Sequence, residues 1–457
     1  MRVLIVGGGD VGALIARRLS REGNEITLVE KDEERCHRLE ESLDARIVQG
    51  DGASYKSLAA AGLSDADMLI AVSSLDEINL LACLIAQAEF GVRVKVARLR
   101  THEVEHWRRI CRDAGLHIDL IIHPESELAA RLLPVLRLPG VSDIVEFAGG
   151  KIKLVGFTIE RDSWLAGCTL EELGRRGPPK HSLIAMIFRG PQVIIPHGAE
   201  RLQAEDHVYI ITRDQDLPAL LTFMGLHQQE RFERVFILGG KQIGIRVAEE
   251  LEKLKVAVKI FERDPKRCEK ISQILKESIV VHGDGGDAEL LVEENIAGVN
   301  AYLALTNDDE DNLIAALLAR RLGARKVAAL INRLNYLPLA QRLGISTSLS
   351  PRLVTVDRIL QFVRKGVVVS VTTFREEEAE AIELMAVPGS PFIGKPLREL
   401  KLPRDAIVGA IVRPGGEALV PRGDAVIAEG DRVIFFTLEG AVARLEKAFL
   451  AQRTTRP

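Results

Sequence analysis

The first part of the chain alternates short apolar runs with longer stretches in which apolar residues recur at helical spacing. The apolar runs fall near residues 2–6, 25–29, 45–48, 68–72 and 92–97. A short continuous apolar run is typical of a strand buried on both faces, and the helical spacing is typical of a covering helix. The pattern therefore predicts a Rossmann-like, doubly wound parallel sheet, with a sixth strand ending at His123.

The same pattern occurs twice. "VLIVGGGDVGALIA" at 3–16 matches "VFILGGKQIGIRVA" at 235–248, and "LIAVSSLDEINLLACLIA" at 69–86 matches "YLALTNDDEDNLIAALLA" at 302–319. Such matches in one register indicate an internal duplication. The segment that follows each copy also repeats, and it reads as short strands separated by turn residues, with one helix. That pattern predicts a small α+β domain after each Rossmann-like domain.

The duplication predicts an α/β protein with four domains in two tandem pairs. We expect a Rossmann-like domain over 1–123 with a crossover helix to about 140, then an α+β domain over 141–227. The second pair is expected over 232–350, with a crossover helix to about 366, and over 367–453. The amphipathic stretches 126–140 and 352–366 have two interpretations. They are either ordinary core helices or crossover helices that exchange between paired domains.

Composition excludes several classes of function. The net charge of −4 gives no bulk attraction to nucleic acid or to an anionic membrane. No segment approaches the roughly 18–20 apolar residues of a membrane span, and the N-terminus does not read as a secretory signal. The five cysteines form no CxxC pair, which argues against a zinc site or a disulfide framework and fits a reducing cytosol.

A glycine-rich loop follows the first predicted strand and opens the first predicted helix. Gly7 permits the tight turn, Gly9 lets a pyrophosphate approach the backbone, and Gly12 lets the helix lie close to the sheet. The free N–H groups at the start of the helix favour a bound phosphate. The predicted site residues of this G-x-G-x-x-G motif are Gly7, Gly8, Gly9, Asp10, Val11 and Gly12.

Polar residues also end the other strands of the first predicted sheet. Glu30 ends the second strand, where a carboxylate accepts hydrogen bonds from both ribose hydroxyls and repels a 2′-phosphate. NAD or another adenine nucleotide is therefore favoured over NADP. We assign Asp51, Ser73 and Ser74 to the adenosine side and Arg98 to the phosphate charge.

The second copy keeps most of these residues. Its predicted site residues are Gly239, Gly240, Lys241, Gln242, Ile243, Gly244, Glu262, Asp284, Thr306 and Asn307. Lys241 stands where a glycine is expected, and Ile331 stands where the repeat offset predicts the counterpart of Arg98. The second loop therefore has three interpretations: it binds a different nucleotide, it binds weakly, or it only holds the assembly together.

No catalytic constellation is evident. A dehydrogenase needs an acid/base group close to its cofactor. The histidines at 102, 106, 117 and 123 have neither a metal-binding spacing nor an obvious orienting carboxylate. We therefore predict no catalytic residue and no metal site. The chain reads as a switch in which nucleotide binding changes conformation.

These motifs resemble those of the TrkA family, the peripheral NAD-binding regulatory subunits of Trk potassium-uptake systems, which are built from tandem RCK domains. The resemblance covers essentially the whole chain and rests on "MRVLIVGGGDVG", "VEKD", "VQGDG", "AVSSLDEINL", "KVARLR" and most of their repeats from 235 onward. It implies nucleotide-binding residues at Gly7 to Val11, Glu30, Ser73, Ser74 and Arg98, and at Gly239 to Ile243 and Glu262 in the second half.

The resemblance also implies partners and a place in the cell. The chain would form a cytosolic homo-oligomeric ring, expected to be a dimer of dimers. That ring would dock on a Trk-type membrane subunit that translocates potassium, at the inner face of the cell membrane. NAD(H), or ATP and ADP, would shift the ring between shapes. The alternatives are a regulator of another cation channel or antiporter, and an NAD-dependent oxidoreductase.

Overall fold

The first sheet of the computed structural model is fully parallel, with strand order β3-β2-β1-β4-β5-β6. Its strands are β1 (Arg2–Val6), β2 (Glu25–Glu30), β3 (Arg46–Gln49), β4 (Met68–Ala71), β5 (Val94–Arg98) and β6 (Leu120–Ile122). Its helices are α1 (Asp10–Arg21), α2 (Glu33–Ser42), α3 (Tyr55–Ala60), α4 (Asp76–Ala88) and α5 (Val104–Asp113), with a 3-10 turn at Leu63–Asp65. This arrangement confirms the Rossmann-like fold, and the observed strands start within two residues of the predicted ones.

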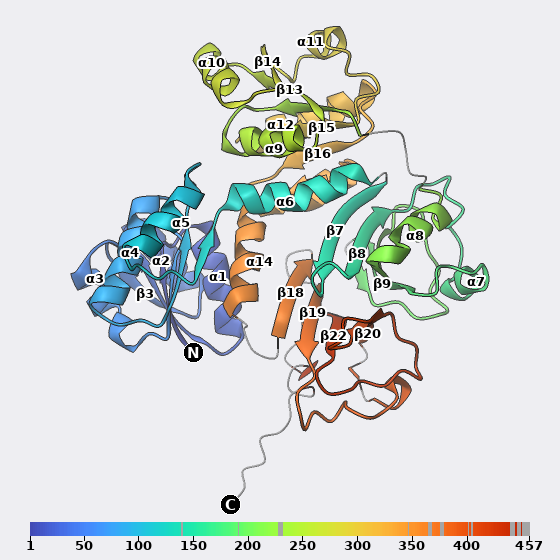
Figure 1. The fold of residues 1–457 in the computed structure, drawn as a ribbon, viewed down its shortest axis with the longest axis horizontal. Helices are drawn as coiled ribbons and strands as arrows, with labels where there is room; N and C mark the ends of the chain where they lie inside the picture. The colour runs from blue at the N-terminus through green and yellow to red at the C-terminus, as the bar shows by residue number, and fades with distance from the viewer. Residues whose placement is uncertain are drawn as a thin grey trace, which may run out of the picture. The chain divides into compact units, whose positions relative to one another are not determined.

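The apolar runs form these strands because both faces of the sheet are covered by helices (Figure 1). All four residues of β4 are buried, as is β1 from Val3 to Val6. The helices begin where short polar side chains cap them. Asp32 accepts a hydrogen bond from the Arg35 N–H at the start of α2, and Ser54 does the same for Ser57 at the start of α3.

The second Rossmann-like domain repeats this topology, with strand order β14-β13-β12-β15-β16-β17. Its strands are β12 (Arg234–Leu238), β13 (Ala257–Glu262), β14 (Ile279–His282), β15 (Ala301–Ala304), β16 (Val327–Leu330) and β17 (Thr347–Leu349). Its helices are α9 (Gln242–Lys253), α10 (Pro265–Ile274), α11 (Ala288–Glu293), α12 (Asp309–Arg321) and α13 (Leu337–Arg342), with a 3-10 turn at Leu334–Tyr336. The duplication inferred from the sequence is therefore present in the fold.

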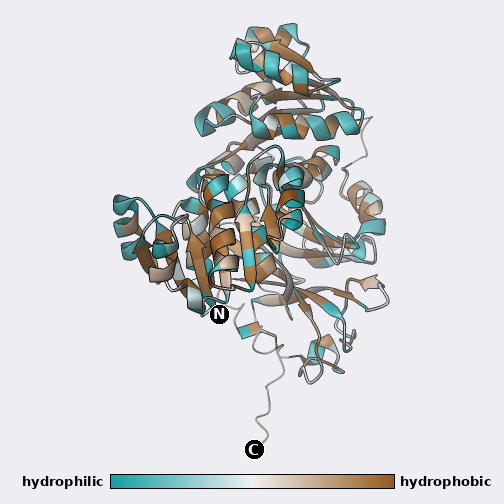
Figure 2. Cartoon of the chain, turned by 60° about the vertical axis from the view of Figure 1, so that its left-hand side comes forward, coloured by the Kyte–Doolittle hydropathy of each residue, from teal (hydrophilic) through white to brown (hydrophobic). Residues whose placement is uncertain are grey.

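Each small domain contains a five-stranded antiparallel sheet, in the orders β10-β9-β11-β8-β7 and β18-β19-β22-β20-β21. The first contains β7 (Val141–Phe147), β8 (Ile152–Thr158), β9 (Ser182–Arg189), β10 (Gln192–Ile194), β11 (His207–Arg213), α7 (Leu170–Arg175) and α8 (Leu217–Phe223), with a 3-10 turn at Asp214–Asp216. The second contains β18 (Val368–Phe374), β19 (Ala379–Met385), β20 (Ala406–Val412), β21 (Ala418–Leu419) and β22 (Arg432–Leu438), with a 3-10 turn at Leu397–Glu399. The apolar residues concentrate in these strands (Figure 2).

The two small domains share a hydrophobic core. Phe188 and Tyr209 from the first sheet pack in one cluster with Phe374 and Phe436 from the second. The rings of Tyr209 and Phe374 meet edge to face, with their centroids 4.8 Å apart. Two amphipathic sheets therefore bury their apolar faces against each other within one chain.

One longer helix connects each Rossmann-like domain to the small domain that follows it. These helices are α6 (Pro124–Arg137) and α14 (Pro351–Val363). Residues 350–363 form one compact unit with residues 1–129, and the rest of the chain forms the other unit. Helix α14 thus belongs to the second half of the sequence but packs beside α1 of the first Rossmann-like domain (Figure 1). The crossover interpretation is confirmed for this helix.

The structure describes residues 1–138, 140–190, 192–226, 232–345, 347–363, 368–374, 379–400, 402–403, 405–438, 444–445 and 449. The predicted domain boundaries at 227, 366, 367 and 453 fall outside these residues. All of the domain boundaries given by the sequence analysis therefore stay predictions. Within the described ranges, no helix combines the length and apolar character needed to cross a membrane. The same ranges hold no group of three or more histidine, cysteine, aspartate or glutamate side chains arranged to bind a metal.

Candidate nucleotide-binding site

The glycine-rich loop has a shape that only glycine permits at two positions. Gly7 has a φ of +103°, and a Cβ built on it would lie 2.8 Å from the Ser73 Cα. A Cβ on Gly12 would lie 1.9 Å from the Gly7 carbonyl oxygen, so this glycine lets α1 lie against the loop. Gly9 differs from both, because no atom of the described part of the chain lies within 4 Å of its Cβ position. The space beside Gly9, at the start of α1, suits the close approach of a phosphate.

Two other residues of the motif have more limited roles than the sequence suggests. Val11 is buried in the core beneath α1, so only its backbone N–H is available to a ligand. A Cβ on Gly8 would meet Leu39 at 2.7 Å and the Glu30 carboxylate at 2.9 Å. Gly8 therefore lets the loop lie against the end of β2.

Glu30 organises the loop from within the fold. Its side chain is buried, and its Oε2 accepts a hydrogen bond from the Gly8 N–H at 2.7 Å. Its Oε1 accepts from the backbone N–H groups of Lys31 and Asp32, at 2.9 and 3.0 Å. The Arg35 guanidinium lies 3.6 Å from Oε2. Sequence reasoning assigned Glu30 to the ribose alone, but the carboxylate also holds the phosphate loop against the second strand.

The other predicted residues lie at the carboxyl ends of neighbouring strands in the same sheet. Asp51 follows β3, accepts from the Ala53 N–H at 2.9 Å, and lies 3.5 Å from the Lys31 ammonium nitrogen. Ser73 follows β4, and its hydroxyl donates to the Leu75 carbonyl at 3.0 Å. Ser74 is exposed. The structure thus brings these residues to the same sheet edge as the glycine-rich loop.

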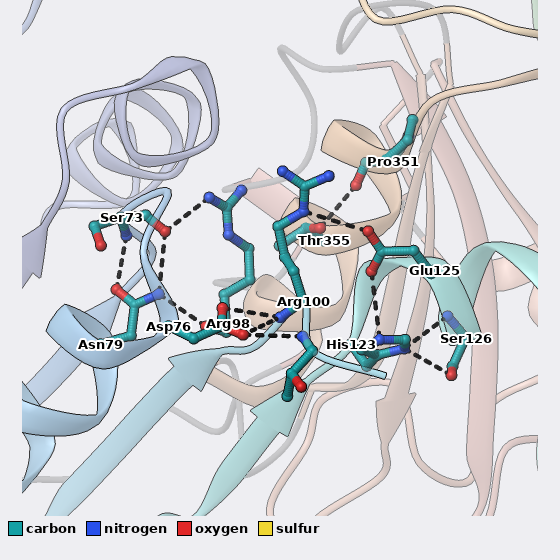
Figure 3. Close-up of polar contacts among 11 residues, drawn as sticks. Ser73, Asp76, Asn79, Arg98, Arg100, His123, Glu125, Ser126, Pro351 and Thr355 are labelled. Atoms are coloured by element: carbon teal, nitrogen blue, oxygen red, sulfur yellow. Dashed lines mark hydrogen bonds and ion pairs between the residues drawn. The ribbon is translucent and has the colours of Figure 1, made fainter. Parts of the chain in front are cut away.

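Arg98, the last residue of β5, places a guanidinium at this edge of the sheet. Its Nη2 donates to the Ser73 carbonyl at 2.8 Å, whereas its buried Nε has no hydrogen-bond partner among the residues that the structure describes (Figure 3). Burial lowers the pKa of Arg98, and the nearby Arg100 lowers it further. A partly buried guanidinium with a buried, unsatisfied Nε–H is a group that an anionic ligand would stabilise. The residues present therefore fit a nucleotide that carries phosphate.

The sequence analysis missed two positioning residues. Asn79 is fully buried; its Oδ1 accepts from the Ser73 N–H at 2.8 Å, and its Nδ2 donates to the carbonyls of Ser73 and Arg98 at 3.1 and 2.8 Å (Figure 3). Asp76 accepts from the backbone N–H groups of Arg100 and Thr101. Both side chains fix the strand ends that carry Ser73 and Arg98. Their recurrence as Asn312 and Asp309 in the repeated segment was the available signal.

The second Rossmann-like domain reproduces this scaffold. Gly239 has a φ of +104°, and a Cβ on Gly244 would lie 2.0 Å from the Gly239 carbonyl oxygen. Glu262 is buried and accepts from the Gly240 N–H at 3.1 Å. Asn312 accepts from the Thr306 N–H at 2.9 Å and donates to the Thr306 and Leu330 carbonyls, both at 3.0 Å. The second loop therefore keeps the shape of a nucleotide-binding loop.

Lys241 changes this loop without changing its backbone. It precedes α9 with φ −87° and ψ −174°, close to the φ −68° and ψ −179° of Gly9 before α1. The side chain is exposed, so the substitution adds an ammonium group to an unaltered scaffold. Gln242 opens α9, and Ile243 is buried beneath it. Asn307 is exposed, as is Ser74 in the first half.

A second difference concerns the cation on the adenosine side, which is an arginine beside Asp284 where a lysine lies beside Asp51. Arg263 donates to Asp284 at 2.8 Å and lies 3.5 Å from Asp311. The hydrogen bond that Arg263 donates to the Asp284 carboxylate raises the pKa of Arg263. Burial alone would raise the pKa of Asp284, but hydrogen bonds from the Gly286 N–H and Arg263 lower it overall. Asp284 is therefore already paired within the chain.

The predicted counterpart of Arg98 is wrong by one residue. Asn79 donates to the Arg98 carbonyl, and Asn312 donates to the Leu330 carbonyl. The next N–H groups, of Leu99 and Ile331, each donate to the neighbouring strand of their sheet. Leu330, not Ile331, therefore stands where Arg98 does, because the chain is one residue shorter between α12 and this point. Both residues are buried apolar side chains, so the second site lacks the arginine in either register.

Known protein families contain domains of the same kind in the same order. The sequence matches the TrkA-N domain over residues 3–124 and 235–351, and the TrkA-C domain over residues 154–225 and 382–450. These segments cover most of the chain and alternate along it. The chain belongs to the TrkA family. The resemblance inferred from the sequence motifs is thereby confirmed.

Relatives in this family match the chain over nearly its whole length. It is 38% identical to the Trk system potassium uptake protein TrkA of Halomonas elongata, with 96% of each chain covered. It is 36% identical to the protein of the same name from Azorhizobium caulinodans, with 98% of each chain covered. A TrkA homolog of Methanosarcina mazei is 35% identical, with 98% of this chain and 100% of the relative covered. These TrkA proteins are named for a transport system and not for an enzyme, which supports the non-enzymatic prediction.

Solved structures show the same architecture. The GsuK RCK domain has a TM-score of 0.60 and 19% identity, covering 98% of this chain and 94% of that chain. A GsuK channel bound to NAD has a TM-score of 0.60 and 20% identity, covering 98% of this chain and 78% of that chain. At these identities the likeness shows the fold alone, and that fold is a tandem of RCK domains.

Proposed function

We propose that this TrkA-family chain is a nucleotide-controlled regulatory subunit of a Trk-type potassium uptake system. In this proposal, the first Rossmann-like domain binds NAD(H), with ATP and ADP as competing ligands. The chain assembles as a homo-oligomer, a dimer of dimers, on a membrane subunit that translocates potassium. It therefore acts at the inner face of the cell membrane through that partner.

One observation carries the nucleotide assignment. The buried Glu30 carboxylate and the buried, unsatisfied Nε of Arg98 lie at the same sheet edge as the open position beside Gly9. A carboxylate at the end of the second strand suits ribose hydroxyls, and the guanidinium suits phosphate oxygens. This charge arrangement favours a dinucleotide with a free 2′-hydroxyl over one with a 2′-phosphate.

The second domain has a modified site in this proposal. Lys241 adds an ammonium group at the start of α9, where a phosphate would bind, and Asp284 is paired with an arginine where Asp51 is paired with a lysine. The side chain blocks the closest approach of a pyrophosphate to the backbone but can itself pair with a terminal phosphate. The second site would therefore favour a mononucleotide over a dinucleotide.

Regulation requires only a difference in affinity between two shapes of the assembly. A nucleotide that binds one shape about 100-fold more tightly than the other shifts their equilibrium by about 2.7 kcal/mol. No chemical turnover is needed for this effect. Helix α14 is a candidate for transmitting it, because it lies against the first nucleotide domain and leads toward β18 of the second small domain.

Calorimetry of the full chain with NADH, NAD, ATP and ADP tests the nucleotide assignment. Glu30→Ala should abolish the tighter dinucleotide event, because it removes the ribose acceptor and releases the Gly8 N–H. Glu30→Gln keeps an acceptor for Gly8 and should weaken binding less. The matched variant Glu262→Gln should leave the tighter event intact. An unchanged dinucleotide event in Glu30→Ala would contradict the main site.

Potassium uptake tests the physiological assignment. A strain that lacks this protein should lose most of its Trk-type uptake, and the wild-type gene should restore it. Co-purification from membranes should recover a potassium-translocating subunit. Normal uptake in the deletion strain would exclude the proposal. Steady turnover of NADH with a carbonyl substrate would favour the oxidoreductase alternative.

A further inference from the structure

The second half of the chain contributes a cation to the first glycine-rich loop. Arg352, the second residue of α14, places its Nη1 2.7 Å from Oδ2 of Asp10, the first residue of α1. About a third of the Arg352 side chain is exposed, and about two thirds of the Asp10 side chain is exposed. The two residues are far apart in sequence, so only the packing of α14 against the first domain brings them together.

Helix α14 holds Arg352 in this place through contacts along its whole length. Val356, Ile359, Leu360 and Val363 are buried in the same core as Ile15 of α1. Burial of four aliphatic side chains contributes several kcal/mol and fixes the helix on the domain.

Two further ion pairs flank this apolar contact. Asp357 lies 3.6 Å from Arg18 of α1, and Arg358 lies 3.6 Å from Glu127 of α6. The Arg18 side chain is nearly fully buried, whereas the Arg358–Glu127 pair is partly exposed. Arg352 is thus presented to the loop by an anchored element and not by a mobile one.

Arg352 pairs with the residue that directly follows the expected phosphate position. Asp10 directly follows Gly9, where the backbone is open to a ligand and where α1 presents its free N–H groups. The carboxylate of Asp10 alone would repel a phosphate at this point. A guanidinium paired with Asp10 offsets that charge and lies within reach of the same space.

The equivalent positions in the other half carry different residues. Gln242 opens α9 where Asp10 opens α1, and Glu125 follows Pro124 in α6 where Arg352 follows Pro351 in α14. Glu125 is buried and lies 3.3 Å from the Arg100 Nε (Figure 3). The aspartate and arginine pair is therefore a feature of the first site.

We propose that Arg352 is a phosphate-binding residue that the second half supplies to the first nucleotide site, and that a bound nucleotide draws its guanidinium from Asp10 to the phosphates. The proposal rests on the nucleotide assignment made above. It specifies how occupancy of that site affects the second half of the chain. Phosphate charge bound at α1 then stabilises the docked position of α14. Because α14 follows the second Rossmann-like domain in the chain, occupancy of the first site is coupled to the second half.

A double-mutant cycle with calorimetry tests this role. Titrations of the full chain with NADH and with ADP should show that Arg352→Gln weakens binding to the first site about tenfold. The same loss should appear when Asp10 is already Asn, because the guanidinium contacts the phosphate itself. Arg352→Lys should recover part of the affinity, since it keeps the charge. Arg358→Gln, which removes a peripheral ion pair of the same helix, should leave both dissociation constants unchanged.

Three results would overturn the inference. Dissociation constants of Arg352→Gln within twofold of the wild type would show that the residue does not bind nucleotide. A loss that disappears in the Asp10→Asn background would show that Arg352 only neutralises Asp10. An equal loss in Arg358→Gln would show that any loosening of α14 has the same effect. Absence of nucleotide binding in the wild type would instead refute the proposed function, and the inference with it.

Discussion

At the scale of single residues, the glycines of the first loop serve different physical purposes. Gly12 is required by packing, because a Cβ there would lie 1.9 Å from the Gly7 carbonyl oxygen. Gly9 is not required by packing, since its Cβ position is open and its backbone is extended. Lys241 occupies the equivalent position in the second loop with nearly the same dihedral angles. The motif thus combines a structural requirement at Gly12 with the ligand-binding role that we propose for Gly9.

Alanine substitutions separate these two requirements. Gly12→Ala should destabilise the first Rossmann-like domain by about 3 kcal/mol or more, because the helix must move away from the loop. Gly9→Ala should cost less than about 1 kcal/mol, since it only changes the residue that precedes α1, yet it should weaken dinucleotide binding. Urea denaturation and calorimetry measure the two effects. Equal losses of stability in both variants would contradict the assignment.

At the scale of elements, a buried lysine holds the end of α6. The Lys326 ammonium donates hydrogen bonds to the carbonyls of Val135 and Leu138, the latter at 3.0 Å. Val135 lies in the last turn of α6 and Leu138 directly follows the helix, so this side chain binds the backbone at the helix end, where carbonyls lack intrahelical partners. Burial lowers the pKa of Lys326 to about 7. The second Rossmann-like domain therefore caps a helix that begins in the first half of the chain.

The burial of Lys326 predicts a pH dependence with a defined sign. A lysine in the unfolded chain has a pKa of about 10.4, so between pH 7 and 10 the unfolded state binds more protons than the folded state. The free energy of unfolding should therefore rise with pH in this window. Lys326→Met should lack this rise, and the difference between wild type and variant should grow from pH 7 to 9.5. A constant difference in urea denaturation across that range would exclude the effect.

At the scale of the whole molecule, the small domains join the two halves. Phe374 of β18 lies in the core that both sheets share, whereas Phe392 lies in a core formed by the second small domain alone. The shared core means that neither sheet buries its apolar face without the other. We therefore expect the two small domains to unfold as one cooperative unit.

Two phenylalanine variants test this cooperativity. Phe374→Ala should cost about 3–5 kcal/mol and should reduce hydrogen-exchange protection in β9 and β11 as well as in β19. Phe392→Ala has a similar cost but should lower protection first in the second small domain. If Phe374→Ala affects only the second small domain, the two sheets are independent units and the shared core is not cooperative.

Much of this architecture was predictable from local patterns. Buried parallel strands read as continuous apolar runs, and the repeated glycine-rich loop gave two Rossmann-like domains. The strand-end residues Glu30, Asp51, Ser73 and Arg98 were predictable because parallel strands bring their carboxyl ends to one edge. The correspondence of Arg98 with Leu330 was not predictable from the sequence. A one-residue difference in chain length cannot be located within a run of apolar residues.

The sequence by itself determined the fold class, the duplication, the family and the residues at the sheet edge, because these depend on periodicity and on short motifs. Only the tertiary structure decided that Glu30 holds the loop, that Asn79 clamps two strand ends, and that Arg352 reaches Asp10. The physical reason is that these contacts join side chains across different elements. Their geometry follows from how helices and sheets pack, and no local spacing encodes it.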